Sequence, residues 1–179
     1  YPYTFGSNRD DRALEILKFL QKNIPDFDCN ALNKKGRTLL HTAAGKGDLK
    51  VVEHLLNNGA KASLNILDTS KETPLEIALA RGYFEVAERL FDNGADPNFL
   101  KNKKCIQALC KNIDLLKKIT TRHPELIEIF VHSSDTEAES LLEYAIAQNH
   151  REAAHWLIEN NKSLTAAYVN SPAIKAAQK

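Results

Sequence analysis

The chain has 179 residues, of which 43% are hydrophobic and 26% are charged, and its formal net charge is +1. No apolar run approaches the ~20 residues that a membrane span needs, and no signal-peptide pattern opens the sequence. The three cysteines have no His or Cys partners at metal-ligand spacing and are too few for a disulfide framework. We therefore expect no cofactor and no metal, and a cytoplasmic or other reducing intracellular compartment.

The first elements in chain order are a short tail and a helix. We interpret residues 1–8 as a linker or the tail of a preceding domain, and residues 9–23 as an opening helix. Ser7 or Asn8 is the expected N-cap of this helix. Its apolar residues recur at helical spacing and are Ala13, Ile16, Leu17, Phe19 and Leu20. The helix is typical of the second half of a helix pair.

Two clear repeats follow, over residues 28–60 and 63–95. Two stretches of the first repeat recur in similar form 35 residues later. Gly36–Ala44 recurs as Lys71–Leu79, and Val51–Ala60 recurs as Val86–Ala95. A fixed period in the thirties predicts stacked helix pairs, none of which can bury its apolar face alone. Such a stack favours binding along an extended surface over chemistry in a pocket.

The repeats carry their own helix start and stop signals. Thr38 and Thr73 are placed to cap the first helix of each pair, because a hydroxyl can accept a hydrogen bond from an unpaired amide. Pro74 follows at the first helical position, where its missing amide costs nothing. Gly59 and Gly94 fit the left-handed residue that ends the second helix. Each repeat is therefore expected to be a helix, a turn and a helix.

The two copies closely resemble the ankyrin repeat. The resemblance rests on Thr38-x-Leu40-His41-x-Ala43-Ala44, on Thr73-Pro74-Leu75 with Ala78, and on the endings Gly59-Ala60 and Gly94-Ala95-Asp96-Pro97-Asn98. It implies an all-α solenoid of about four repeats with partial ends, joined by hairpin-like loops, over residues 9–179. It also implies a protein-protein interaction module, and a role for His41 in hydrogen bonding between neighbouring hairpin loops.

Less regular units follow the two clear repeats. We expect a degenerate repeat over residues 98–131 with a short or tilted first helix, a repeat over 137–161, and a partial repeat over 162–179. Residues 124–131 depart from the pattern and are interpreted as a short helix, with a strand as the alternative and a loop at Ser133–Asp135. Trp156 falls on the apolar stripe of a second helix, which favours core packing over ligand stacking.

Charge is distributed unevenly along the chain. Residues 98–122 have a net charge of +6, and residues 125–159 have a net charge of −7. In the ankyrin pattern the hairpin tips and the ends of the first helices line one concave face. The positions that match this face and are candidates for partner contact are Lys34, Lys35, Arg37, Lys46, Thr69, Arg81, Tyr83, Asn102 and Lys103. An acidic protein or peptide would complement them, although lysine-rich loop tips often serve only solubility.

Other classes of function have less support. The basic positions lack the interleaved aromatic residues of a nucleic-acid surface, so nucleic acid is not an expected partner. No phosphate-binding loop, nucleophile elbow or zinc-protease motif is present, so we expect no enzymatic activity from this chain.

Because the chain has no methionine and starts at Tyr1, we interpret it as a fragment of a larger protein. The alternative functions are a substrate-docking domain of a protein-modifying enzyme or of a secreted bacterial effector that acts in a host cell, and a plain spacer between domains.

Overall fold

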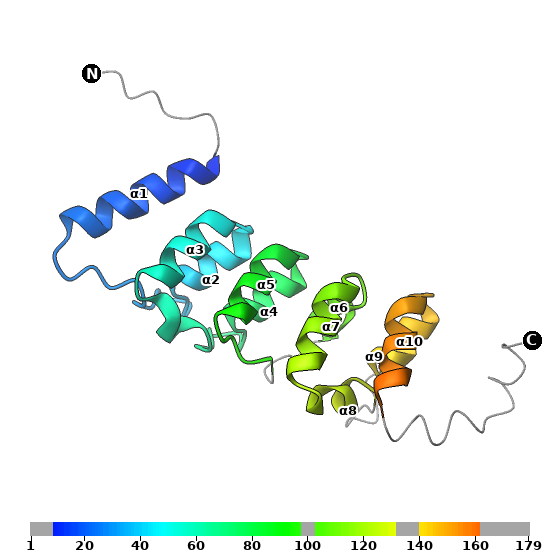
Figure 1. Cartoon of the computed structure of the whole chain (residues 1–179). Helices are drawn as coiled ribbons and strands as arrows, with labels where there is room; N and C mark the ends of the chain where they lie inside the picture. Colours follow the sequence, from blue (N-terminus) through cyan, green and yellow to red (C-terminus); the bar gives the residue numbers. More distant parts are fainter. Residues whose placement is uncertain (1–8, 98–102, 132–139, 162–179) are drawn as a thin grey trace, which may run out of the picture. The chain divides into compact units, whose positions relative to one another are not determined.

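The computed structural model describes residues 9–97, 103–131 and 140–161. These residues form ten α-helices and one 3-10 helix and contain no strand (Figure 1). The chain divides into two compact units, residues 1–100 and residues 101–179. We call them the first unit and the second unit and describe each by itself.

The first unit is a stack of helix pairs. It contains α1 (Arg9–Asn23), α2 (Leu39–Lys46), α3 (Leu49–Asn57), η1 (Ala60–Ser63), α4 (Pro74–Ala80) and α5 (Phe84–Asp92). Helices α2 and α4 are the first helices of their pairs and pack on each other. The second helices of the pairs pack in the order α1, α3 and α5. Figure 1 shows α2 beside α4 and α3 beside α5 in neighbouring layers. The all-α repeat architecture predicted from the sequence is confirmed.

The helix ends lie where the sequence predicts them. The Thr38 side chain accepts a hydrogen bond from the amide of His41, and Thr73 does the same for Glu76, with Pro74 in the first turn of α4. Gly59 and Gly94, just beyond the second helices, have φ values of 100° and 99°. Only glycine adopts this region without strain, so each repeat ends with a backbone turn that fixes the direction of the chain into the next hairpin.

The core of the first unit is a line of interlocked side chains between successive layers. Ala44 of α2 and Ala78 of α4 are fully buried, and their small size lets the first helices lie close together. Leu55 of α3 and Leu90 of α5 fill the space between the second helices and are also fully buried. Burying a leucine contributes about 1.5–3 kcal/mol. These residues therefore tie each repeat to the next one.

Helix α1 is covered on one side only. Leu17 is buried against the stack, and Gln21 Oε1 lies 2.6 Å from Nε2 of His54 on α3. Ile16 and Phe19 are 59% and 65% exposed. The apolar stripe predicted for this helix is thus only partly buried. The candidate N-caps Ser7 and Asn8 lie outside the described residues.

The second unit contains α6 (Lys103–Leu109), α7 (Ile113–Arg122), α8 (Glu125–Val131), α9 (Leu141–Ala147) and α10 (Arg151–Asn160). Helix α6 has seven residues, as many as α4, so it is not shorter than the first helix of a regular repeat; the alternative that it is tilted stays a prediction. The irregular segment 124–131 is helical in α8, and the strand alternative is wrong. The predicted loop at 133–135 and the partial repeat at 162–179 lie outside the described residues.

Trp156 lies at the edge of the second unit's core. It is half-buried, whereas Ala153 and Leu157 of the same helix are buried. Its indole Nε1 donates to Oγ1 of Thr120 at 3.0 Å, and Nζ of Lys117 lies 5.4 Å from the ring centroid. Trp156 therefore packs against residues of α7 but is not fully buried, because neighbouring helix positions face directions about 100° apart and Leu157 takes the inward one.

Candidate partner-binding surface

Each hairpin loop of the first unit is closed by the same set of hydrogen bonds. In the first loop Asn33 Oδ1 accepts from the amides of Lys35 and Arg37 at 2.8 Å and 3.1 Å, and the Asn33 amide donates to the Arg37 carbonyl at 3.0 Å. Asp68 repeats all three bonds in the next loop, with the same separations of two and four residues. The loop tips are thus rigid backbone turns of one kind.

Neighbouring loops are joined to each other by a buried ion pair. Arg37 Nε donates to Asp68 Oδ2 at 2.7 Å, and the Asp68 side chain is only 1% exposed. Arg37 also lies 3.9 Å from Glu72, and the Thr69 amide donates to the Lys35 carbonyl at 3.0 Å. Burial would raise the pKa of Asp68, but the hydrogen bonds from Arg37 and from two backbone amides outweigh it and lower the pKa. Arg37 therefore holds the two loops together.

His41 makes a second link between the loops. Its Nδ1 accepts from the Thr38 amide at 3.1 Å, and its Nε2 lies 3.0 Å from the Ile66 carbonyl in the next loop. An amide can only donate and a carbonyl can only accept, so the neutral ring carries its proton on Nε2. The expected role of His41 in bonding between hairpin loops is confirmed. Burial lowers the pKa of His41, which keeps the ring neutral.

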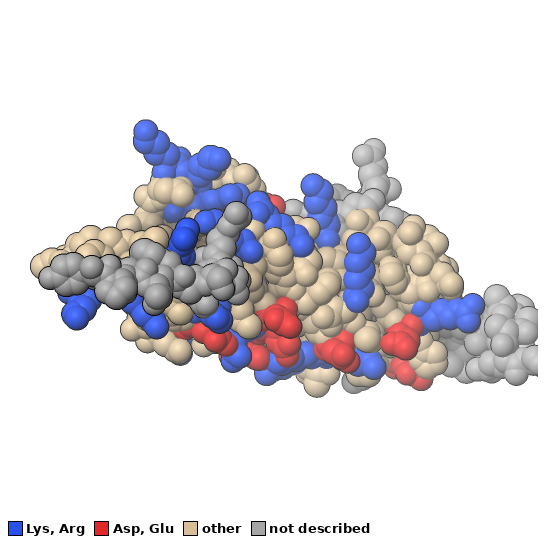
Figure 2. All heavy atoms as spheres, turned by 90° about the horizontal axis from the view of Figure 1, so that it is seen from above, with Lys and Arg blue, Asp and Glu red and all other residues tan. Residues whose placement is uncertain are grey.

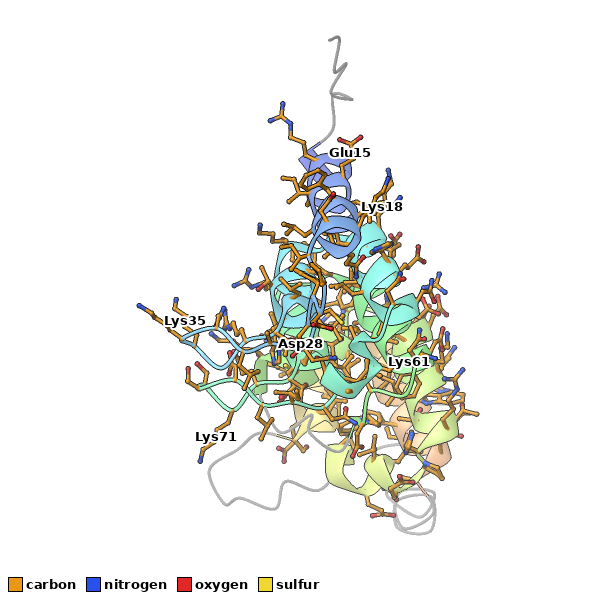
Figure 3. The ribbon with its side chains drawn as sticks, turned by 90° about the vertical axis from the view of Figure 1, so that its left-hand side faces the viewer. Glu15, Lys18, Asp28, Lys35, Lys61 and Lys71 are labelled. Atoms are coloured by element: carbon orange, nitrogen blue, oxygen red, sulfur yellow. The ribbon has the colours of Figure 1, made fainter. Side chains whose placement is uncertain are left out.

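Four lysines extend from this framework into solvent. Lys34 and Lys35 lie at the first hairpin tip, Lys71 at the second, and Lys46 at the end of α2; all four are exposed. Within the described part of the chain none of them has an ion pair. Figure 3 shows Lys35 and Lys71 pointing away from the helices on the same side, opposite Lys61. In the left part of Figure 2, basic side chains project along the upper edge, and the lower edge carries acidic and basic side chains together.

The other candidates in the first unit have structural partners. Arg81 Nη1 donates to the Gly45 carbonyl. The ring of Tyr83, which is 38% exposed, lies against Gly47. Thr69 is exposed at the second hairpin. Arg81 and Tyr83 thus contact the preceding repeat as well as being exposed.

Two candidates do not belong to the described part of the first unit. Asn102 lies outside the described residues, and Lys103 is the first residue of α6 in the second unit. Their contribution to partner binding stays a prediction.

Sequence reasoning missed three residues of this surface. Lys71 occupies the position of Gly36 in the first repeat, and both have a left-handed backbone, with φ of 61° and 66°. Leu32 and Leu67 are 59% and 44% exposed, and they too are 35 residues apart. Applying the repeat period to every loop position, and not only to the helices, would have found all three.

No group of three or more His, Cys, Asp or Glu among the described residues could hold a metal ion. Cys29, Cys105 and Cys110 are buried free thiols, and burial raises the pKa of Cys110 to about 12, so its thiolate is strongly disfavoured. No helix in the described ranges is both long and apolar enough to cross a membrane.

Comparison with known families agrees with the geometry. A family model of ankyrin repeats in three copies matches residues 8–101. A comparison with curated protein sequences found no match. Ankyrin repeats are generally protein-protein interaction modules and are typically non-catalytic. The matched residues span more than half of the chain and contain the capped helix pairs, the left-handed glycines and the linked hairpin loops described above. The chain belongs to the ankyrin-repeat family.

Proposed function

We propose that the first unit binds an extended acidic segment of a partner protein along its hairpin loops and the ends of its first helices. The observation that carries this proposal is the row of exposed lysines Lys34, Lys35, Lys46 and Lys71, which have no ion pair in the described residues. Unpaired cations on one edge attract a negatively charged partner and orient it during encounter.

The linked loops support the proposal because they hold the lysines on a fixed backbone. Arg37, Asp68 and His41 join successive loops through short hydrogen bonds. A surface that is already ordered before binding does not lose backbone freedom when the partner arrives. Only the lysine side chains have to be restrained.

Two exposed apolar residues refine the proposed chemistry of the partner. Leu32 and Leu67 are exposed at equivalent positions of successive loops. Packed helices lie about 8–10 Å apart, and an extended chain rises about 3.3 Å per residue. A partner segment would therefore place about three residues over each repeat. We propose that, in each stretch of about three residues, this segment offers one acidic side chain to the lysines and one apolar side chain to the leucines.

A peptide library tests this proposal. The library consists of extended peptides in which Glu and Leu occupy different positions of a three-residue repeat, with matched peptides that carry Lys in place of Glu. The wild-type chain is expected to bind members of the Glu set and not the Lys set, with a dissociation constant that rises with salt. Failure of the whole Glu set to bind would overturn the proposal.

Charge reversal locates the surface. K35E/K71E is expected to weaken binding of the Glu peptides at least tenfold at low salt. K18E/K61E is the matched control, because it changes the net charge equally at two exposed lysines that point away from the hairpin tips (Figure 3). Equal effects of the two double variants would show that the attraction is due to net charge alone and would contradict the assigned surface.

A further inference from the structure

An apolar groove opens in the first unit between α1 and α2. Its volume is about 350 Å³, and its walls include Ile16 and Leu20 of α1, Leu39 and Ala43 of α2, and Phe27 from the connecting segment. Ile16 is 59% exposed and Leu39 is 37% exposed. Large apolar side chains left open to solvent in a concave surface are typical of interaction sites.

The repeat itself shows what would cover this groove. Leu39 and Thr42 of α2 correspond, 35 residues later, to Pro74 and Ile77 of α4. Pro74 and Ile77 are buried, whereas Leu39 and Thr42 are exposed. The difference arises because α2 packs on α4, while no first helix among the described residues packs on the matching face of α2.

The contact between α2 and α4 also indicates which kind of helix would fit over α2. A Cβ built at Gly45 of α2 would lie only 3.2 Å from Cγ2 of Ile77, so α4 requires a small residue opposite this side chain. Arg81 of α4 donates to the carbonyl of Gly45, near the carboxyl end of α2. A helix that covers α4 in this way has a small-residue face and presents terminal carbonyls to a cation.

The groove has a cation in the equivalent place. Lys46 corresponds to Arg81 and lies at the groove wall. The carboxyl end of a helix carries unpaired carbonyls and a partial negative charge, which a lysine stabilises. The acidic residue at this wall, Asp48, accepts a hydrogen bond from the Val51 amide and caps α3. The positive charge of Lys46 thus complements the carbonyl groups at the carboxyl end of a helix that lies along α2.

We propose that this groove binds a short helix of a partner protein, which lies along α2 as α2 lies along α4. The helix has about two turns, carries Ala or Gly on the face toward Leu39 and Thr42, and ends with its carbonyls at Lys46. This site is separate from the hairpin lysines except for Lys46, which belongs to both surfaces. A partner could therefore place a helix in the groove and an acidic segment along the loops.

A peptide with the sequence of Thr38–Gly47, held helical by a lactam staple, tests the proposal, because α2 is the helix that covers the equivalent face of α4. The staple is needed since so short a helix is marginal in water. Fluorescence anisotropy with the full chain is expected to show saturable binding. I16E and L39E should each weaken it at least tenfold, and circular dichroism confirms that the variants fold. F19E is the matched control, because Phe19 is an exposed residue of the same helix outside the groove.

The remaining outcomes distinguish a site in the groove from non-specific binding and from self-association. Equal binding by I16E and F19E, or no binding by the wild-type chain, would overturn the proposal. Concentration-dependent self-association in sedimentation that I16E abolishes would identify a second copy as the occupant and would also overturn it. K35E/K71E should leave binding of the stapled peptide unchanged, so failure at the groove and failure at the hairpin lysines can be told apart.

Discussion

The aromatic ring of Tyr83 lies against Gly47 of the preceding repeat, so closely that a Cβ at Gly47 would be 2.6 Å from Cδ1 of the ring. Gly47 also has a φ of 72°. We expect G47A to destabilise the first unit by about 2–4 kcal/mol, because it combines left-handed strain with displacement of the ring.

G82A is the control, since Gly82 has a φ of 77° and a Cβ at that position would meet no atom within 4 Å. Chemical denaturation should show a smaller loss for G82A, of about 1–2 kcal/mol. Equal losses would mean that the ring contact contributes nothing.

The ion pair between Arg37 and Asp68 predicts an acid-sensitive link between hairpin loops. The pKa of Asp68 is lower in the folded chain than in the unfolded chain, so its contribution is present above pH ~4 and is lost as the pH falls through the folded value. D68N should lower the free energy of unfolding at pH 7 by about 1.5–3 kcal/mol. The difference between wild type and D68N should shrink between pH 4 and pH 2.

R37Q tests whether the effect passes through the pair. In a double-mutant cycle D68N should cost less in the R37Q background than in the wild type. Additive losses at pH 7 would contradict the link.

His41 predicts a second pH dependence in a higher range. Its folded pKa lies below the ordinary value because the ring is buried, so the unfolded chain binds the proton more readily. Stability should therefore be full at pH 7.5 and fall as the pH drops below ~6.5. Protonation at Nδ1 also removes the acceptor for the Thr38 amide.

The variant H41Q isolates this contribution. It should be less stable than wild type at pH 7.5, yet lose less stability between pH 7.5 and pH 5. His54, whose pKa burial also lowers, is present in both proteins and cancels in the comparison. The same pH slope in wild type and H41Q would show that His41 does not titrate in this range.

The Trp156–Thr120 hydrogen bond predicts a measurable link between α10 and α7. W156F removes the indole donor but leaves the Thr120 hydroxyl its bond to the Leu116 carbonyl at 2.8 Å. The expected loss is about 1 kcal/mol in denaturation followed by circular dichroism. T120V in the W156F background should cost less than T120V alone, because both changes break the same bond. Strictly additive losses would show that the bond is not formed in solution.

The regular parts of the fold could be predicted because their signals are local. A threonine before a helix, a proline in its first turn and a glycine after it act within a few residues, as at Thr38, Pro74 and Gly59. The repeat period then places these signals in successive layers. The all-α stack follows from these signals and that period, and the family resemblance follows from the motif strings that the two copies share.

The surface could be predicted only in outline, because its details depend on contacts between loops. Lys35 and Arg37 look alike in the sequence, yet Arg37 is bound to Asp68 in the next loop and Lys35 is exposed. Lys71 was missed because a left-handed lysine replaces the glycine of the first repeat. Trp156 and Leu157 are both apolar, yet only Leu157 is buried, because adjacent helix positions face directions about 100° apart.

A charge swap tests directly whether the hairpin lysines bind an acidic partner. Titration calorimetry would compare wild type and K35E/K71E against a Glu/Leu peptide and its Lys/Leu counterpart at low salt. We expect wild type to bind the Glu/Leu peptide, and K35E/K71E to lose at least tenfold in affinity for it and to gain affinity for the Lys/Leu peptide. Unchanged affinity of K35E/K71E for the Glu/Leu peptide would contradict the claim that the hairpin lysines bind an acidic partner.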